Sequence, residues 1–374
     1  MKINNEPKLD FDDVLLVPQR SKTASRSDVK MERKFSFYHS SQPWTGIPII
    51  AANMDTVGTF EMSRSLSKKT MITCLHKHYD VDQYADNMFN YNYQWVSIGI
   101  KEEDIIKLRQ ICNTLYQPPN ICIDVANGYT DDFVNFCGRI REEFGSIPVI
   151  MAGNVCTPEM VQEIILHGGV DIVKVGVGPG SACTTRLKTG VGYPQLSAII
   201  ECSHAAHGLR NGSGRLGLIC ADGGCRTPSD VSKAFAAGAD FVMLGGMLAG
   251  CEECEGEWEY EYKGMITNND GSIHSEWWQP NHPGCFTEKR KKSLTFYGMS
   301  SHAAQEKYGG IKDYRASEGR VKTVPYKGPV DNVINDILGG IRSACAYIGS
   351  TSLKDMSKCA EFVRVNRTHF DQSV

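Results

Sequence analysis

Eight short, continuous apolar runs, separated by segments with helical spacing, constrain the fold of this 374-residue chain more than any other feature. The runs are residues 47–54, 71–76, 95–100, 120–126, 148–154, 170–177, 216–224 and 240–246. Runs that stay apolar rather than alternating are typical of parallel strands buried on both faces. Strand and helix alternating about eight times favours a (β/α)8 barrel of the α/β class. A doubly wound open sheet is the alternative, and the count of eight favours the barrel.

The segments between the runs carry helix start and stop signals. Thr157 and Thr227 are suited to N-caps, and each is followed by a proline, Pro158 or Pro228, at the first helical position. A glycine stands near the end of both segments, where it would stop the helix. A further helical pattern over residues 331–349 predicts a closing helix.

The regular pattern breaks after the eighth run. Glutamates alternate with aromatic residues over 257–262, which predicts a half-buried strand, and residues 268–272 are a turn signal. Residues 292–301 are expected to be the returning strand. We therefore predict one barrel domain over residues 1–374, with an inserted hairpin or flap at residues 251–296.

The predicted hairpin has an acidic first arm and a basic stretch, residues 288–292, before its second arm. Opposite charges on facing strands favour cross-strand pairing. Its aromatic residues, among them Trp277 and Trp278, would form an unusually large apolar patch if they were exposed. The hairpin is therefore expected to fold back on its own barrel, to pack on a neighbouring subunit, or to hold a regulatory ligand.

Composition restricts the class of partner. The formal net charge is −3, which gives no reason to expect a nucleic acid or a membrane as partner. No apolar run approaches the roughly 20 residues that span a bilayer. The 14 cysteines have no disulfide framework, which is typical of a reduced protein and predicts a cytoplasmic one.

Glycine-rich loops follow the last two predicted strands, at the end of a barrel where active sites lie. Gly223 and Gly224 follow the seventh run, and Gly245 and Gly246 follow the eighth. Bare backbone N–H groups in these loops can approach a phosphate closely, so the pattern favours phosphate binding. The alternative is that the glycines serve only tight turns.

A lone cysteine, Cys183, stands in the polar loop "GVGPGSACTTR" after the sixth run. Neighbouring cationic and hydrogen-bonding groups favour the thiolate, so Cys183 is a candidate nucleophile or, alternatively, an inert thiol. His76 and His78, two positions apart, make a metal site conceivable, but neither they nor the "CEEC" at residues 251–254 have a second ligand pair at matching spacing. We therefore favour polar loop residues over zinc ligands.

Together these motifs resemble the IMP dehydrogenase/GMP reductase family. The resemblance rests on "ANMDTVGTFEM", "HKHY", "DVANGY", "GVGPGSACTTR", "ADGGC", "FVMLGGM", "FYGMSS", "YRASEG" and "VPYKG". It runs from about Leu9 into the C-terminal tail, with its main interruption between Glu257 and Ser293. Residues 209–217, "LRNGSGRLG", are longer than the family norm.

The resemblance implies NADPH-dependent reductive deamination of GMP to IMP and ammonia. Cys183 would attack C2 of the purine and form a covalent thioimidate, while Thr185 and Glu318 would handle the proton of the departing amine. It also implies a homo-oligomer, expected to be a tetramer, and a bound K+ ion held by backbone carbonyls of Gly178, Gly180, Cys183 and Arg186.

The resemblance implies two binding sites. The residues expected to hold GMP are Asp222, Gly223, Gly224, Gly245, Gly246, Gly298, Met299, Ser300, Arg315, Ala316, Ser317, Glu318 and Gly319. Those expected to hold NADPH are Ser25, Arg26, Lys77, Asp124, Val125, Ala126, Val177, Gly178, Met299, Tyr314, Arg315, Ser343, Ala344, Cys345 and Ala346. Ser25, Arg26 and residues 343–346 would complete that site across a subunit boundary. Arg26 is expected to pair with the 2′-phosphate, although Arg26 alone would suit a solvated loop.

Two rival functions remain. IMP dehydrogenase, which oxidises IMP with NAD, shares the cysteine loop, but it usually carries a paired CBS module between the second and third strands. His76 and Trp95 are too close in the sequence for that module, and no Arg-Tyr dipeptide that could activate water occurs in the chain. A non-catalytic purine-nucleotide-binding barrel would keep the glycine loops but would not need Cys183, Thr185 and Glu318 together.

Overall fold

The computed structural model describes residues 3–21, 23, 25–267, 272–278, 286–309 and 316–365. Within them eight parallel strands close into a barrel in the order β12-β13-β4-β5-β6-β7-β8-β9. The strands are β4 (Ile49–Ala51), β5 (Ile72–Leu75), β6 (Gln94–Ile98), β7 (Asn120–Asp124), β8 (Ile150–Val155), β9 (Ile172–Val175), β12 (Leu218–Asp222) and β13 (Phe241–Leu244). Each predicted run overlaps one barrel strand, so the barrel is confirmed. The open sheet is wrong, because β13 pairs with β4 and β9 pairs with β12.

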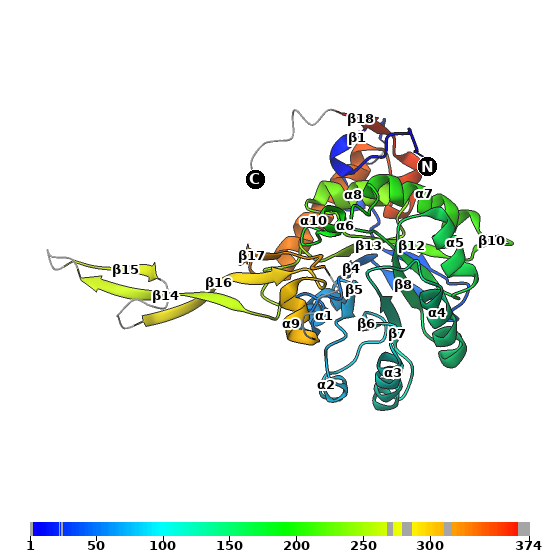
Figure 1. Cartoon of the computed structure of the whole chain (residues 1–374). Helices are drawn as coiled ribbons and strands as arrows, with labels where there is room; N and C mark the ends of the chain where they lie inside the picture. Colours follow the sequence, from blue (N-terminus) through cyan, green and yellow to red (C-terminus); the bar gives the residue numbers. More distant parts are fainter. Residues whose placement is uncertain are drawn as a thin grey trace.

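Helices surround this barrel (Figure 1), and one follows each barrel strand. They are α1 (Phe60–Ser67), α2 (Val81–Asp86), α3 (Glu102–Leu115), α4 (Asp131–Phe144), α5 (Pro158–Leu166), α7 (Gln195–Gly208), α8 (Pro228–Ala236) and α10 (Val330–Tyr347). Shorter helices are α6 (Thr185–Thr189), α9 (His302–Tyr308) and α11 (Met356–Cys359), with 3-10 turns at Phe11–Asp13, Arg26–Asp28 and Leu353–Asp355. None of the helices in the described ranges is long and apolar enough to cross a bilayer.

The predicted caps are present. Thr157 and Thr227 occupy the N-caps of α5 and α8, with Pro158 and Pro228 as the first helical residues. The Thr227 hydroxyl accepts a hydrogen bond from the backbone N–H of Asp230, which satisfies a donor that the first turn leaves free. The closing helix expected over residues 331–349 is α10.

Alternate residues of each barrel strand point to the interior or to the helices. In β9, Ile172 packs in the interior cluster, whereas Val173 and Val175 pack in the cluster beneath the helices. The hairpin of β2 (Arg33–Phe35) and β3 (Trp44–Gly46) closes the amino end of the barrel. There Phe35 stacks on Phe241 with ring centroids 4.5 Å apart. The plugged amino end leaves the carboxyl ends of the strands as the open face.

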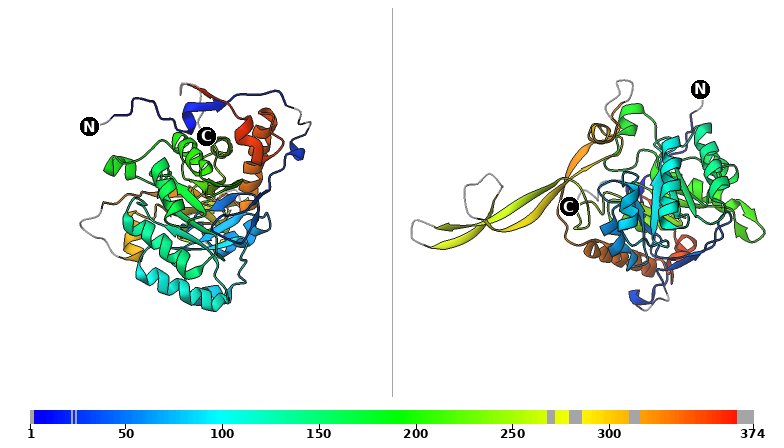
Figure 2. Two further views of the ribbon diagram at one scale, coloured as in Figure 1. Left: turned by 90° about the vertical axis from the view of Figure 1, so that its right-hand side faces the viewer. Right: turned by 90° about the horizontal axis from the view of Figure 1, so that it is seen from below.

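After β13 the chain leaves the barrel as a long arm, formed by β14 (Trp258–Thr267), β15 (Ile273–Trp278) and β16 (Phe286–Tyr297) (Figure 1; Figure 2). With β17 (Val321–Pro325) these strands form an antiparallel sheet in the order β15-β14-β16-β17. The predicted hairpin is confirmed, but β15 was not expected, and most of the expected turn, 268–271, lies outside the described residues.

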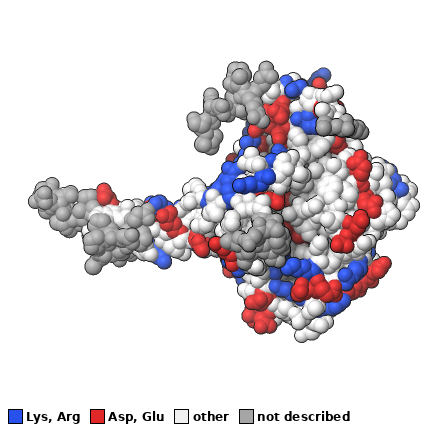
Figure 3. Space-filling model, viewed as in Figure 1, with Lys and Arg blue, Asp and Glu red and all other residues white. Residues whose placement is uncertain are grey.

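The expectation that the arm folds back on its own barrel is wrong for its distal part, which extends away from the barrel in Figure 1 and in the right-hand view of Figure 2. Cations cover the aromatic faces instead: Lys289 Nζ lies 3.9 Å from the ring centroid of Tyr260, and Arg290 Cζ lies 3.8 Å from that of Trp277. Such contacts lower the cost of leaving an aromatic ring outside a core. Figure 3 shows both signs of charge along the described part of the arm.

The predicted pairing of acidic and basic strands is confirmed. Glu261 on β14 forms an ion pair with Arg290 on β16. A second pair has the opposite sense, since Lys263 on β14 pairs with Glu288 on β16 at 3.1 Å. Two short sheets complete the fold. β1 (Val14–Leu16) pairs with β18 (Phe362–Arg364) near the termini, and β10 (Arg210–Asn211) pairs with β11 (Gly214–Arg215) within the long segment before β12.

Candidate functional site

Two adjoining cavities open at the carboxyl ends of the barrel strands. The cysteine pocket, of about 210 Å³, is lined by Cys183 and by the glycine loops that follow β12 and β13. The lysine pocket, of about 780 Å³, is lined by Lys77, Lys101 and Lys107. The two pockets share the lining residues Asn53, Asp124 and Met299. A molecule in one pocket can therefore reach a molecule in the other.

Cys183 lies in the loop after β9, and its backbone N–H donates to the carbonyl of Gly180 at 3.0 Å. Its Sγ lies 3.2 Å from Thr185 Oγ1, and the Thr185 hydroxyl donates to Glu318 Oε2 at 2.7 Å. The structure thus brings the three predicted catalytic residues into one continuous chain of thiol, hydroxyl and carboxyl groups. Such a chain can pass a proton between a nucleophile and a carboxylate.

Backbone pairing holds Glu318 beside the cysteine loop although the two are far apart in the sequence. Cys183 and Gly319 form an antiparallel bridge. The N–H of Thr184 donates to the Glu318 carbonyl at 2.8 Å, and the N–H of Arg320 donates to the Ala182 carbonyl at 2.9 Å. The carboxyl group is therefore positioned by main-chain hydrogen bonds on both sides of the residue.

Asp222, at the end of β12, is held by two neighbours that the sequence analysis missed. Its Oδ2 accepts hydrogen bonds from Asn154 Nδ2 at 2.9 Å and from Lys174 Nζ at 3.3 Å. Lys174 is fully buried and also contacts Asp124. Burial alone would lower the pKa of Lys174, but the two carboxylates raise it well above its ordinary value. A charged residue inside an apolar run was the signal that could have identified Lys174.

The loops after β12 and β13 need glycine for steric reasons. Gly223 and Gly224 both have φ of +87°, a conformation that side chains disfavour. A Cβ at Gly298 would lie 2.8 Å from the Ala182 carbonyl oxygen, so the strand after the arm could not approach the cysteine loop. The cysteine pocket is lined by Gly223, Gly224, Gly245, Gly246, Gly298 and Met299. The sequence analysis expected all six to bind GMP. Ser300 lines the lysine pocket, and Ala316, Ser317, Glu318 and Gly319 line neither.

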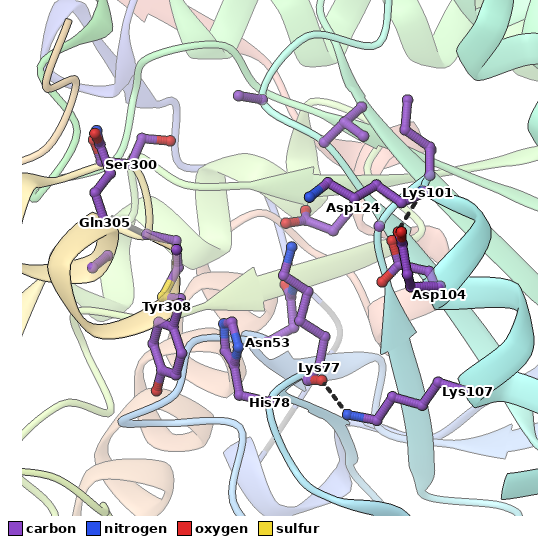
Figure 4. A pocket seen from close by; sticks show the side chains of 18 residues that line it. Asn53, Lys77, His78, Lys101, Asp104, Lys107, Asp124, Ser300, Gln305 and Tyr308 are labelled. Carbon is purple, nitrogen blue, oxygen red and sulfur yellow. Dashed lines mark hydrogen bonds between the residues drawn. The ribbon is translucent and has the colours of Figure 1, made fainter. Parts of the chain in front are cut away.

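Figure 4 shows the lysine pocket, with Lys77, Lys101 and Asp124 arranged around it. Lys107 Nζ donates to the Lys77 carbonyl at 2.8 Å. One wall is aromatic, because His78 stacks on Tyr308 with ring centroids 3.4 Å apart. Burial lowers the pKa of His78 to about 4, so this ring is neutral near pH 7. The predicted cofactor residues Lys77, Asp124, Val125, Ala126 and Met299 all line this pocket.

A second group missed by the sequence analysis joins the barrel rim to the segment that carries Met299 and Ser300. The buried Asp55 Oδ2 accepts hydrogen bonds from Tyr297 Oη at 2.5 Å, Tyr308 Oη at 2.7 Å and Lys307 Nζ at 3.0 Å. Burial alone would raise the pKa of Asp55, but these three donors hold it below its ordinary value. Asp55 therefore clamps both ends of the segment 297–308.

Replacing Asp55 with Asn is expected to reduce the stability of the fold by about 1–3 kcal/mol at pH 7, because the amide loses the charge-assisted hydrogen bonds. The folded pKa of Asp55 lies below its unfolded value of about 3.9. Its contribution is therefore complete above that value and is lost as the pH falls through the folded pKa. Thermal unfolding at pH 7 and pH 3 measures this, with the exposed Asp82→Asn as the control. The same difference from wild type at both pH values would contradict the expectation.

Some residues that were predicted to bind NADPH do not line these pockets in the single chain. Ser25 and Arg26, in the 3-10 turn Arg26–Asp28 and its cap, lie near α10, which carries residues 343–346. None of these residues lines either pocket. Tyr314 and Arg315 lie outside the described residues.

The predicted cation loop is compact. Gly178 has φ of +78°, and a Cβ there would lie 2.7 Å from Arg186 Cγ. The guanidinium of Arg186 reaches Asp10 at 3.3 Å, and the Arg186 carbonyl accepts a hydrogen bond from the Gly190 N–H at 3.2 Å. Val177 is buried, and neither it nor Gly178 lines the two pockets.

The zinc alternative gains no support. His76 stacks on Tyr79 with centroids 3.8 Å apart, and Cys254 Sγ donates to the Leu248 carbonyl at 3.3 Å. Within the described ranges no three His, Cys, Asp or Glu residues are grouped so that they could hold a metal ion.

The fold and this site define a (β/α)8-barrel protein with a cysteine-centred site at the carboxyl end of the barrel. The model of the IMP dehydrogenase / GMP reductase domain matches residues 8–92, 95–275 and 280–373. The chain therefore belongs to the IMP dehydrogenase/GMP reductase family. The sequence analysis expected the main interruption of the resemblance between Glu257 and Ser293. Within that region the family model leaves only residues 276–279 unmatched.

Individual relatives are similar over almost their whole length. A protein named GMP reductase from Photobacterium profundum is 50% identical over 371 residues, which cover 98% of this chain and 97% of the relative. GMP reductase 2 from Homo sapiens is 50% identical over 370 residues, covering 98% and 96%. A GMP reductase from Onchocerca volvulus is 48% identical over 378 residues, covering 99% and 94%.

Proposed function

We propose that the chain catalyses the NADPH-dependent reductive deamination of GMP to IMP and ammonia. The observation that carries the proposal is the chain of contacts that runs from Cys183, which lines the cysteine pocket, through Thr185 to Glu318. The names of the similar proteins support the same reaction, since three relatives that match nearly end to end are GMP reductases.

GMP occupies the cysteine pocket in this proposal. Asp222 binds the ribose hydroxyls, and the backbone N–H groups of Gly223, Gly224, Gly245 and Gly246 bind the phosphate. The remaining contacts to GMP come from Gly298–Ser300 and residues 315–319. Lys174 and Asn154 orient the Asp222 carboxylate through its Oδ2 atom.

The first chemical step is the addition of the Cys183 thiolate to C2 of the purine, which makes that carbon tetrahedral. The exocyclic amine receives a proton through Thr185 and Glu318, the C2–N bond breaks, and ammonia leaves. The product on the enzyme is a thioimidate, whose C2 is electrophilic. When a hydride has been added to C2, the C–S bond breaks, which releases IMP and regenerates the thiolate.

The lysine pocket is large enough for a dinucleotide portion and adjoins the cysteine pocket. NADPH bound there supplies the hydride. Lys77, Asp124, Val125 and Ala126 orient it, and Lys77 adds a cation for its phosphates. Tyr314 and Arg315 contribute from the same chain, and residues 25–26 and 343–346 contribute from a neighbouring subunit, because in their own chain they lie away from the pocket.

A monovalent cation, K+, fits the donor set of the loop that carries Cys183, since carbonyl oxygens suit such an ion. The carbonyls of Gly178, Gly180, Cys183 and Arg186 would hold it. The protein's own contribution is to keep the cysteine loop in one conformation, which the bond from Cys183 N–H to the Gly180 carbonyl already favours.

The proposed assembly is a homotetramer in the cytoplasm. A cofactor site shared between subunits requires an oligomer. The cysteines of the described ranges are all free, which suits a reducing compartment.

Incubating the protein with GMP and NADPH and following nicotinamide absorbance tests the function. Absorbance should fall only when both are present, and IMP and ammonia should appear in equal amounts. Oxidation of IMP with NAD instead would favour the dehydrogenase. Nucleotide binding without turnover in either direction would favour a non-catalytic barrel.

Arg26→Ala is expected to raise the KM for NADPH by roughly tenfold, with little effect on the KM for NADH, because a guanidinium pairs with the 2′-phosphate that only NADPH carries. Steady-state kinetics with the two cofactors measure this. Arg20→Ala, which removes an exposed cation from the same N-terminal segment, is the control. Equal weakening for both cofactors would show that Arg26 does not bind the 2′-phosphate.

Replacing residues 265–287 by an Asn-Gly turn is expected to lower the mass of the assembly at low protein concentration. The change removes the distal arm, which extends from the barrel and is free to meet a neighbouring subunit, and it keeps the pair Lys263–Glu288 at the new tip. Light scattering across a dilution series measures the mass. GMP affinity serves as the control for folding and should be retained, while an unchanged mass would exclude the subunit contact.

A further inference from the structure

A third cavity, of about 340 Å³, lies at the opposite end of the barrel from Cys183. It is lined by Leu218, the first residue of β12, and by Asp240, which directly precedes β13. The cysteine pocket, in contrast, is built from residues that follow the strands. We call this third cavity the amino-end cavity. It is separate from every residue of the proposed reaction.

Positive charge dominates the lining of the amino-end cavity. Six lysines and arginines line it, against one carboxylate, that of Asp240. The cations are Arg33, Lys34, Arg210, Arg215, Lys354 and Lys358. They come from four separate parts of the fold: β2, the β10–β11 hairpin, the 3-10 turn Leu353–Asp355, and α11. Tertiary folding, and not one run of basic sequence, gathers them.

Asp240 cannot neutralise this set, because its acceptors are already used. Oδ1 accepts from Arg33 Nη2 at 3.1 Å and from Arg215 Nη1 at 3.3 Å. Oδ2 contacts His207 Nε2 at 2.7 Å and accepts from the Ile219 N–H at 3.2 Å. The Asp240 side chain is only 2% exposed, so no further cation can reach it from the solvent side.

Three of the other cations have no carboxylate partner within the described ranges. Lys358 pairs with Asp355 at 3.1 Å, whereas no ion pair is found there for Lys34, Arg210 or Lys354. Like charges that share a concave wall repel one another and raise the local concentration of anions. Arg33 adds a planar guanidinium at the base of the cavity with only 12% exposure, already fixed over the Phe35 ring at 4.5 Å.

We propose that the amino-end cavity is a binding site for a small polyanion that carries phosphate groups. Guanidinium groups match phosphate oxygens in geometry, and three cations without carboxylate partners suit a di- or triphosphate better than a single carboxylate. Phe35, Phe235 and Leu353 supply an apolar side to the same cavity. A phosphorylated compound with a flat or apolar part therefore fits both walls.

The segment "LRNGSGRLG" forms part of this site. It folds as the β10–β11 hairpin, with Arg210 paired opposite Arg215 and Ser213 in the turn. All three of these residues line the cavity. The hairpin thus supplies two of the six cations, and its role as a wall of the amino-end cavity explains why two arginines face one another across so short a sheet.

Isothermal titration calorimetry with inorganic triphosphate tests the site. Saturating GMP and NADP+ are present so that the cysteine pocket and the lysine pocket are filled. Wild-type protein should bind about one equivalent. Lys34→Ala/Arg210→Ala should weaken binding at least about tenfold. Lys34→Arg/Arg210→Lys, which keeps both charges, should bind nearly as wild type does.

The matched control is Arg20→Ala/Lys68→Ala, which removes two exposed cations elsewhere on the barrel and should leave triphosphate affinity unchanged. Thermal unfolding of all variants separates loss of binding from loss of fold. Absence of binding to wild type, or equal affinity in wild type and Lys34→Ala/Arg210→Ala, would overturn the proposal. The readout is binding, so the outcome is independent of whether the enzyme reduces GMP.

Discussion

Cys183→Ala should reduce turnover of GMP by about four orders of magnitude or more while GMP affinity stays within roughly tenfold of wild type. The thiol is the only side chain in the proposed reaction that forms a bond to C2, so its removal abolishes the covalent step. Affinity should survive because the proposed binding mode assigns the phosphate to the backbone of Gly223, Gly224, Gly245 and Gly246 and not to the thiol. Initial rates and equilibrium binding of GMP measure the two quantities.

Cys225→Ala is the matched control, because Cys225 lines the same pocket. Burial raises the pKa of the Cys225 thiol well above its ordinary value, so this group stays protonated and unreactive. Its replacement should change turnover by no more than about threefold, within the range of minor packing changes. Appreciable turnover by Cys183→Ala would exclude the covalent mechanism, whatever the result for Cys225→Ala.

Glu318→Gln should slow the release of ammonia by about two to four orders of magnitude and slow hydride transfer much less. Glutamine keeps the length of the side chain and can still accept the hydrogen bond that Thr185 donates to Oε2 at 2.7 Å. It cannot carry the proton that the departing amine requires. Single-turnover measurements separate the two steps, since ammonia release precedes hydride transfer.

The reverse direction gives a second measure of Glu318. Starting from IMP and NADP+, hydride transfer does not need the amine, so the variant should form NADPH in a first turnover at a rate close to wild type. Glu306→Gln, an exposed residue of α9, is the control for a nearby lost charge. If both steps fell equally in Glu318→Gln, the carboxyl group would position the loop through Thr184 and not transfer a proton.

Local sequence determined the barrel and the loop that carries Cys183. The eight runs predicted the strands because a short apolar stretch between turn signals is long enough for a buried parallel strand and too short for a typical helix. Thr157 and Thr227 predicted helix starts because capping depends on neighbours within three residues. The loop around Cys183 and the glycines after the last two strands could be recognised for the same reason, since turn conformation is a property of adjacent residues.

Only the tertiary structure decided which distant groups meet. Asp55 is clamped by Tyr297, Lys307 and Tyr308, more than 240 residues later, and nothing in their local sequence indicates the contact. Lys174 could be noticed as a charge in an apolar run, but its partners Asp124 and Asp222 follow from barrel closure, which turns alternate residues of neighbouring strands inward.

The direction of the arm was also misjudged. Burial was expected for its aromatic residues, and cations from another strand of the arm cover them instead. The contacts of Asp55 and Lys174 and the direction of the arm depend on side chains that meet only after the backbone has folded. Burial, charge and packing between distant residues therefore decide them, whereas the conformational preferences of neighbouring residues do not.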